Sequence, residues 1–210
     1  MENAALGFRV HSGWAAAVAV GVEKGAPVVL ARQRVHLVDT FTYEFRQPYH
    51  TAGKMLLGQA REFIARMQAE ARQLACGAVR EIASKTQEQG VKLTRCGLLL
   101  ASGRTLPGLE KILTSHALIH TADGELFREA LLYAGARCGL REFTVKEKEL
   151  LGRAGQVLRT KPDELMRRVT ELGRSVGAPW SQDEKFATLA AWLASTGSAK
   201  KLPKEAIRNG

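Results

Sequence analysis

Apolar residues in the first 40 positions alternate with other residues as they do in β-strands. Apolar runs over residues 6–10, 14–22 and 28–38 are separated by two short segments that contain glycine, 11–13 and 23–27. Neighbouring side chains of a strand point to opposite faces of a sheet, and the run over 28–38 shows this alternation clearly. Because the two connections are short, the pattern predicts three consecutive strands in an antiparallel meander.

Helical spacing dominates the remainder of the chain and is interrupted by two further strands. In residues 54–89 apolar side chains recur three, four and seven positions apart, which predicts one long helix with a single apolar stripe. Residues 91–101 contain a continuous apolar run that predicts a strand buried on both faces. A second helix is predicted over 123–138 and a fifth strand over 141–145. Helical patterns then continue to residue 196.

The order of these elements limits the fold. A meander followed by strands that alternate with helices requires a mixed sheet with helices packed against it. We therefore predict an α/β fold with a mixed five-stranded sheet, an antiparallel meander followed by βαβ units, and helices on both faces. The segment 39–52 is expected to be a loop, and 107–122 a short helix and a loop. Residues 1–196 are expected to form one domain, and residues 197–210 a flexible basic tail.

The chain carries a large excess of positive charge. Its 210 residues include 31 Lys and Arg against 21 Asp and Glu, which gives a formal net charge of +10. A basic surface attracts polyanions, and nucleic acid is the commonest of them. We therefore expect a nucleic-acid partner, DNA or RNA. The competing interpretation is that the charge serves solubility alone.

The cysteines and the hydropathy bear on the compartment. Cys76, Cys96 and Cys138 are widely spaced and form no CxxC pair, which supports neither a disulfide framework nor a zinc site. Cys76 and Cys96 are expected to be buried free thiols, and free thiols indicate a reducing compartment. The longest early apolar run, 14–20, is too short to span a bilayer. We expect a cytoplasmic protein with no membrane partner, and the oligomeric state stays open.

Three short motifs follow one another along the chain. They are Leu6-Gly7 followed by Gly13-Trp14, the run Phe143–Lys146, and Asp183-Glu184 ahead of Leu189–Ala191. Together with the order of elements, over residues 5–195, they resemble the Holliday-junction resolvases of the ribonuclease H-like superfamily. The resemblance implies a site in which about four carboxylates hold two divalent cations, which activate water and stabilise the leaving oxygen.

Two of the carboxylates that the resemblance implies are missing from this chain. The first would lie on the opening strand, where Arg9 stands. The second would lie at the end of the fourth strand, where residues 99–104 contain no acid and the nearest is Glu110. An arginine repels cations and can bind phosphate through two parallel hydrogen bonds. We therefore expect a nucleic-acid-binding relative of these nucleases that lacks efficient metal-dependent cleavage.

Two other functions stay open. One is a non-enzymatic scaffold that binds another protein. The other is a nuclease with an atypical site, in which Asp183 and Glu184 are the candidate catalytic residues and Mg²⁺ or Mn²⁺ is the cofactor. The expected contacts to nucleic acid are Arg9, His11, Arg104, Lys146, Arg167 and Arg168. The last two belong to a basic cluster with Arg159, Lys161 and Arg174, which a solvated helix face would explain equally well.

Several local signals have structural interpretations that compete with functional ones. Ser181, followed three residues later by Glu184, fits a helix-capping box. His116 and His120 would share one face of a helix and could ligate a metal, but no third ligand is evident, and a surface role is simpler. Residues 102–104 fit a plain turn after a strand.

The three tryptophans could stack on bases, but packing is the simpler interpretation for each of them. Trp192 falls beside a helical apolar stripe, and Trp14 opens a strand. Trp180 is the best candidate for exposure, and it could equally pack onto the helix that follows it.

Overall fold

The five predicted strands form one mixed sheet. The structure is a computed structural model that describes residues 4–101, 103 and 105–197. The strands within this part are β1 (Ala4–His11), β2 (Trp14–Glu23), β3 (Ala26–His36), β4 (Leu93–Leu100) and β5 (Arg141–Lys146). Their order across the sheet is β3-β2-β1-β4-β5. β1 pairs antiparallel with β2 and parallel with β4, and β5 extends the parallel half. The predicted meander and the predicted sheet are therefore confirmed.

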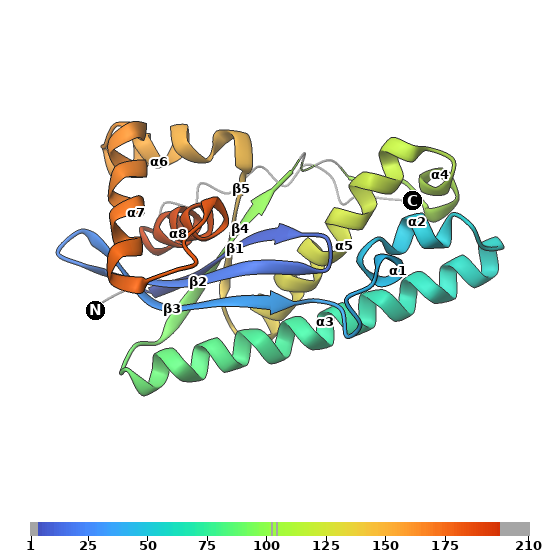
Figure 1. The fold of residues 1–210 in the computed structure, drawn as a ribbon, viewed down its shortest axis with the longest axis horizontal. Coiled ribbons are helices and arrows are strands. Elements are labelled where there is room, and N and C mark those ends of the chain that lie inside the picture. The colour runs from blue at the N-terminus through green and yellow to red at the C-terminus, as the bar shows by residue number, and fades with distance from the viewer. Residues whose placement is uncertain (1–3, 102, 104, 198–210) are drawn as a thin grey trace.

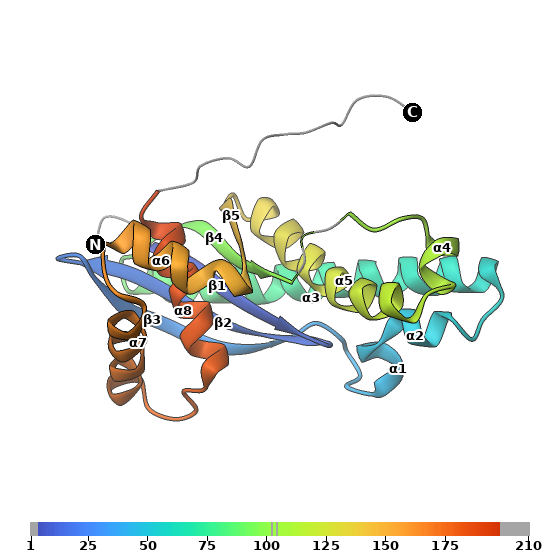
Figure 2. The same cartoon turned by 90° about the horizontal axis from the view of Figure 1, so that it is seen from above.

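Helices cover both faces of this sheet, as predicted (Figures 1 and 2). The helical segments of the described part are α1 (Tyr43–Arg46), α2 (Pro48–Ala52), α3 (Leu57–Glu88), α4 (Leu109–Leu113), α5 (His116–Arg137), the 3₁₀ turn η1 (Glu147–Glu149), α6 (Leu150–Leu158), α7 (Pro162–Val176) and α8 (Gln182–Ser195). The long helices α3 and α5 pack on one face, and α8 packs on the other with α6 and α7 beside it. Neither layer contains a helix long and apolar enough to cross a membrane, as far as the described residues extend.

The alternation along β1 explains why the sheet has two cores. Leu6 and Phe8 are fully buried in the cluster that contains α3 and α5, whereas Ala5 is fully buried in the cluster that contains α8. Residues two apart share a face, so Gly7 and Arg9 lie on the α8 side together with Ala5. Each large apolar side chain that is removed from water contributes about 1.5–3 kcal/mol to the stability of the fold.

α8 lies unusually close to the middle of the sheet. A Cβ atom placed on Gly7 would come within 2.0 Å of the carbonyl oxygen of Ala187, and one placed on Gly97 within 2.5 Å of that of Ala190. These two glycines belong to the neighbouring strands β1 and β4, and they pair with each other across the sheet. The absence of side chains at both positions therefore sets the depth and the position of α8 on the sheet.

Two connections differ from their predictions. Residues 39–52 were expected to be a loop, but α1 and α2 form there, and Pro48 occupies the first position of α2, where its fixed φ favours a helix. The helix α5 was expected to begin at residue 123, but it begins at His116. The side chain of Ser115 caps it by accepting a hydrogen bond from the backbone N–H of Leu118, at 3.4 Å.

Most predicted structural roles of single side chains hold. Cys76 and Cys96 are buried free thiols, and Trp192 of α8 is 2% exposed in the core between that helix and the sheet. Trp180 is a correction, because it is partly buried against the preceding helix instead of standing exposed. Its ring lies against Gly173 of α7, and its indole N–H donates to the backbone oxygen of Val169 at 2.8 Å. The predicted basic tail falls almost wholly on residues 198–210, which lie outside the described part.

Candidate nucleic-acid interface

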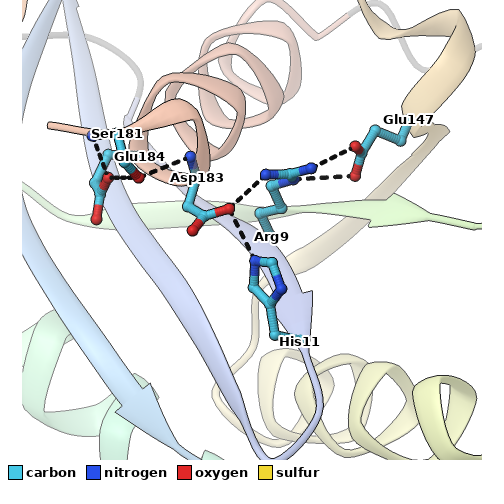
Figure 3. Close-up of polar contacts among 6 residues, drawn as sticks. All are labelled: Arg9, His11, Glu147, Ser181, Asp183 and Glu184. Carbon is cyan, nitrogen blue, oxygen red and sulfur yellow. Dashed lines mark hydrogen bonds and ion pairs between the residues drawn. The ribbon is translucent and has the colours of Figure 1, made fainter.

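Arg9 lies between two carboxylates near the carboxyl end of β1 (Figure 3). Its Nε donates to Oε2 of Glu147 at 3.1 Å, and its Nη2 donates to Oε1 of Glu147 at 2.7 Å. Its Nη1 donates to Oδ1 of Asp183. The same Asp183 oxygen lies 2.8 Å from Nε2 of His11. The guanidinium of Arg9 thus lies between two carboxylates, where the resemblance to the resolvases implies a divalent metal ion.

The close packing of α8 brings Asp183 to Arg9. Asp183 lies one helical turn before Ala187, whose carbonyl faces Gly7, and Arg9 lies two residues after Gly7 on the same face of β1. The guanidinium of Arg9 also lies 5.2 Å from the ring centroid of Phe186. The contact between Gly7 and α8 therefore positions the ion pair two residues further along the strand.

Asp183 and Glu184 were predicted as an acidic pair, and in the structure their carboxylates bond to different partners. Glu184 completes the predicted capping box, with its Oε2 accepting from the backbone N–H of Ser181 at 2.7 Å and from the Ser181 hydroxyl at 2.6 Å. The Ser181 hydroxyl in turn accepts from the backbone N–H of Asp183 at 3.1 Å. Glu184 therefore faces the start of α8, and Asp183 alone of the two bonds to Arg9.

Glu147 is the residue that the sequence interpretation missed. It follows Lys146 directly, in the 3₁₀ turn at the carboxyl end of β5. The sequence does contain a signal for its position. The carboxyl ends of parallel strands meet at one edge of a sheet, and Glu147 is the first acidic residue after β5. Its partner, Arg9, lies on β1, two strands away from β5 in the sheet. Whether the two side chains meet across β4 in a bidentate contact depends on their length and on the twist of the sheet.

The charges in this cluster stabilise one another. Burial raises the pKa of Asp183, but the hydrogen bonds and charges of His11 and Arg9 outweigh that effect, and the pKa lies below its ordinary value. The hydrogen bond to Glu147 raises the pKa of Arg9 against the opposing effect of burial. The side chains of Arg9 and Asp183 are 18% and 20% exposed, so the pair is shielded from much of the solvent. Both groups are ionised at neutral pH.

These donors do not fit a pair of divalent cations. Such a site needs several anionic oxygens that are free to face the metals. Among the described residues, the carboxylates bonded to Arg9 are those of Asp183 and Glu147, and the guanidinium already uses both. The carboxyl end of β4, where the resemblance to the resolvases implies a further carboxylate, is formed by Leu99 and Leu100, as the sequence already indicated. A positive guanidinium at this place repels a second cation.

A row of aromatic and cationic side chains adjoins Arg9 at the β1–β2 hairpin. The His11 and Trp14 rings stack with centroids 4.3 Å apart, at 11° between their planes. The guanidinium of Arg34 lies 3.8 Å from the centroid of the Trp14 ring. Further out, the guanidinium of Arg46 lies 4.5 Å from the centroid of the exposed Phe41 ring. We call these five residues the stacking row.

A hollow connects the stacking row with the Arg9 cluster, which consists of Arg9, His11, Glu147 and Asp183. It has a volume of about 390 Å³, and its lining includes Trp14, Arg32, Arg34, Ser181 and Asp183. Arg32 also donates to the carbonyls of Gly177, Ala178 and Pro179, and so holds the segment before α8 against β3. The hollow therefore joins two basic strand positions, the half-buried Arg32 and the exposed Arg34, to the partly buried ion pair.

Of the other predicted contact residues, one adjoins this cluster, two lie on α7 and one lies outside the described residues. Lys146 pairs with Glu149 at 3.6 Å, next to Glu147. Arg167 and Arg168 both pair with Glu164 on α7, and Arg168 lines a hollow with Pro27, at the opposite end of β3 from Arg34. Those ion pairs are typical of a solvated helix face. Arg104 lies outside the described residues, as does Ser102 of the predicted turn.

His116 and His120 have a third histidine beside them, contrary to expectation. One ring nitrogen from each of His50, His116 and His120 lies within 4.8 Å of the others. His50 belongs to α2, in the segment that was expected to be a loop, so its position could not be inferred from spacing along the chain.

Comparison with solved structures identifies proteins of the same architecture. Thermus thermophilus RuvC in complex with a Holliday junction substrate matches with a TM-score of 0.55 and 14% identity, over 96% of this chain and all of that one. A second structure of RuvC from the same organism matches with a TM-score of 0.50 and 13% identity, over 90% of this chain and 91% of that one. Neither the protein-family models nor the sequences of curated proteins give a significant match. The chain therefore has the ribonuclease H-like fold in the form that is found in RuvC resolvases.

Proposed function

We propose that this protein binds nucleic acid through the β1–β2 hairpin and the hollow beside it, and that it does so without efficient metal-dependent cleavage. The observation that carries this proposal is the guanidinium of Arg9, which is bonded to both Asp183 and Glu147. The fold supports it, because one of the matching RuvC structures is a complex with a Holliday junction substrate.

The side chains around the hollow suit nucleic acid. Bases stack on aromatic rings, and arginine guanidinium groups stack on bases and bind phosphates. The stacking row supplies both kinds of group, and the net charge of +10 supplies long-range attraction for a polyanion. Arg34 is the best placed for phosphate, because it is exposed and lines the hollow. Arg9 acts indirectly, because its bond to Asp183 holds the start of α8 in place beside the hollow.

The loss of cleavage follows from the charge at Arg9. Metal-dependent hydrolysis of a phosphodiester requires a cation that lowers the pKa of water and stabilises the leaving oxygen. An arginine can neutralise phosphate charge, but its guanidinium stays protonated and generates no hydroxide nucleophile. Cleavage therefore requires a carboxylate in place of Arg9, whereas binding does not.

Fluorescence anisotropy with labelled duplex, single-stranded and four-way-junction DNA, and with RNA, tests the binding. We expect the affinity to fall steeply with salt. Arg34→Gln should weaken binding and lower the slope against log salt by about 1. Arg61→Gln is the matched control, because it removes the same charge from an exposed position on α3. Trp14→Ala should also weaken binding, because it removes the ring on which the guanidinium of Arg34 stacks.

The same probes, incubated with Mg²⁺ or Mn²⁺, test the absence of cleavage. We expect intact probe after incubation with the wild-type protein. Manganese-dependent cleavage that disappears in Asp183→Asn would establish the nuclease instead. Weak binding to every probe, with Arg34→Gln and Arg61→Gln behaving alike, would refute binding at the hollow.

A further inference from the structure

A second cluster of polar side chains lies away from Arg9, on the other side of the sheet. Helix α2 packs against α5, and Figures 1 and 2 show the two helices side by side. His50 of α2 faces His116 and His120, which lie one turn apart in the first two turns of α5. Ring centroids of His120 lie 4.4 Å from those of both His50 and His116.

We propose that His50, His116 and His120 form a binding site for one divalent transition-metal ion, with Zn²⁺ the first candidate. One ring nitrogen from each lies within 4.8 Å of the others, and no other group of three such ligands occurs in the part of the chain that the structure describes. Tetrahedral zinc with bonds of about 2.0–2.1 Å places its ligand nitrogens roughly 3.3 Å apart. Rotation of the two exposed histidines on α5 closes that difference.

A buried carboxylate supports this assignment independently. Oδ2 of Asp123 lies 2.5 Å from Nδ1 of His50, and Oδ1 of Asp123 accepts from the backbone N–H of Tyr49 at 2.7 Å. Asp123 is 3% exposed, so its position is fixed by the core. Histidines that ligate metals commonly donate their other ring N–H to a carboxylate, which fixes the tautomer and orients the ring. Asp123 therefore leaves Nε2 of His50 free for a metal.

The ligand set selects the kind of metal. Imidazole nitrogens suit Zn²⁺, Ni²⁺ and Cu²⁺, whereas Mg²⁺ and Ca²⁺ prefer oxygen ligands, which this group of three does not supply. Three histidines leave one position of a tetrahedral ion open to water or to a ligand from outside. The exposure of His116 and His120 gives the ion a path from solvent. A bound ion would join the segment between β3 and α3 to the start of α5.

Metal titration of the full-length chain tests the proposal. The protein is freed of metal with a chelator and titrated with Zn²⁺ against a chromophoric competitor, and with Co²⁺ followed by its visible absorption. We expect one equivalent of Zn²⁺ to bind and Co²⁺ to give the intense bands of tetrahedral coordination. Neither assay depends on nucleic acid, so failure here leaves the proposed function untouched.

Variants distinguish this site from other histidines and from carboxylates. His116→Gln and His120→Gln change exposed residues, and each should weaken Zn²⁺ binding by about 100-fold or more. His36→Gln removes an exposed histidine of β3 and should leave binding unchanged. Asp123→Asn should weaken binding by about 10–100-fold without changing the stoichiometry. Absence of stoichiometric binding to the wild type, or equal affinity in His36→Gln and His120→Gln, would overturn the proposal.

Discussion

The ion pair between Arg9 and Asp183 should couple strongly in folding stability. The side chains are 18% and 20% exposed, and Arg9 makes a charged hydrogen bond to Asp183 besides two to Glu147. Hydrogen bonds to charged groups contribute about 1.5–3 kcal/mol, whereas exposed ion pairs contribute about 0–1 kcal/mol. Because the pair keeps some access to solvent, we expect a coupling energy of about 2 kcal/mol at pH 7.

A double-mutant cycle with Arg9→Met and Asp183→Asn measures this coupling by urea unfolding. Arg9→Met should destabilise more, by roughly 3 kcal/mol, because it leaves two carboxylates facing each other without a cation. Asp183→Asn should cost about 1–2 kcal/mol, since the amide oxygen still accepts hydrogen bonds. The pair Arg61–Glu110 serves as control, because its atoms are 3.9 Å apart and both side chains are mostly exposed. Its coupling should stay below about 0.5 kcal/mol.

The coupling should also depend on pH in a defined direction. The pKa of Asp183 is lowered in the folded state, so its contribution to stability is present above the pKa of the unfolded chain, about 3.9. The contribution is lost as the pH falls through the lower, folded-state pKa. A coupling energy below about 0.5 kcal/mol at pH 7, equal to that of the control pair, would refute the reasoning.

Three further predictions follow from the site and the packing around it. Arg9→Asp places a third carboxylate beside Asp183 and Glu147, so millimolar Mn²⁺ should raise the Tm of this variant by more than it raises that of the wild type. Gly97→Ala should destabilise by about 3 kcal/mol or more, measured by urea unfolding, because its Cβ would lie 2.5 Å from a backbone oxygen of α8. Burial raises the pKa of the Cys96 thiol to about 12, so iodoacetamide at pH 8 should alkylate Cys96 only after unfolding, as peptide mapping would show.

The sequence predicts the sheet well because its signals are local. The alternation of the first three strands and the apolar run of β4 come from neighbouring residues, and all five strands form near their predicted bounds. Arg9 was also within reach of prediction, because its position on β1 follows from that alternation. The capping box at Ser181 is equally local, and it holds.

The remaining features depend on contacts between distant segments. Glu147 reaches Arg9 across β4, over 138 residues of sequence, and no periodicity encodes that contact. His50 meets His116 because α2 packs on α5, and α2 itself lies in a segment whose apolar spacing shows no clear period. The closeness of α8 follows from two glycines on different strands, which sequence alone does not pair.

The position of α8 has a consequence for synthesis on the ribosome. Its residues, 182–195, pack on β1, which consists of residues 4–11, so the first strand is covered only after the whole intervening chain has been made. Until then the α8 side of the sheet, including Ala5 and Val18, exposes apolar surface. Arg9 likewise has no Asp183 to bind. A nascent or truncated chain that ends before residue 182 therefore offers chaperones and proteases an uncovered sheet, and the Arg9–Asp183 ion pair first forms when folding is complete.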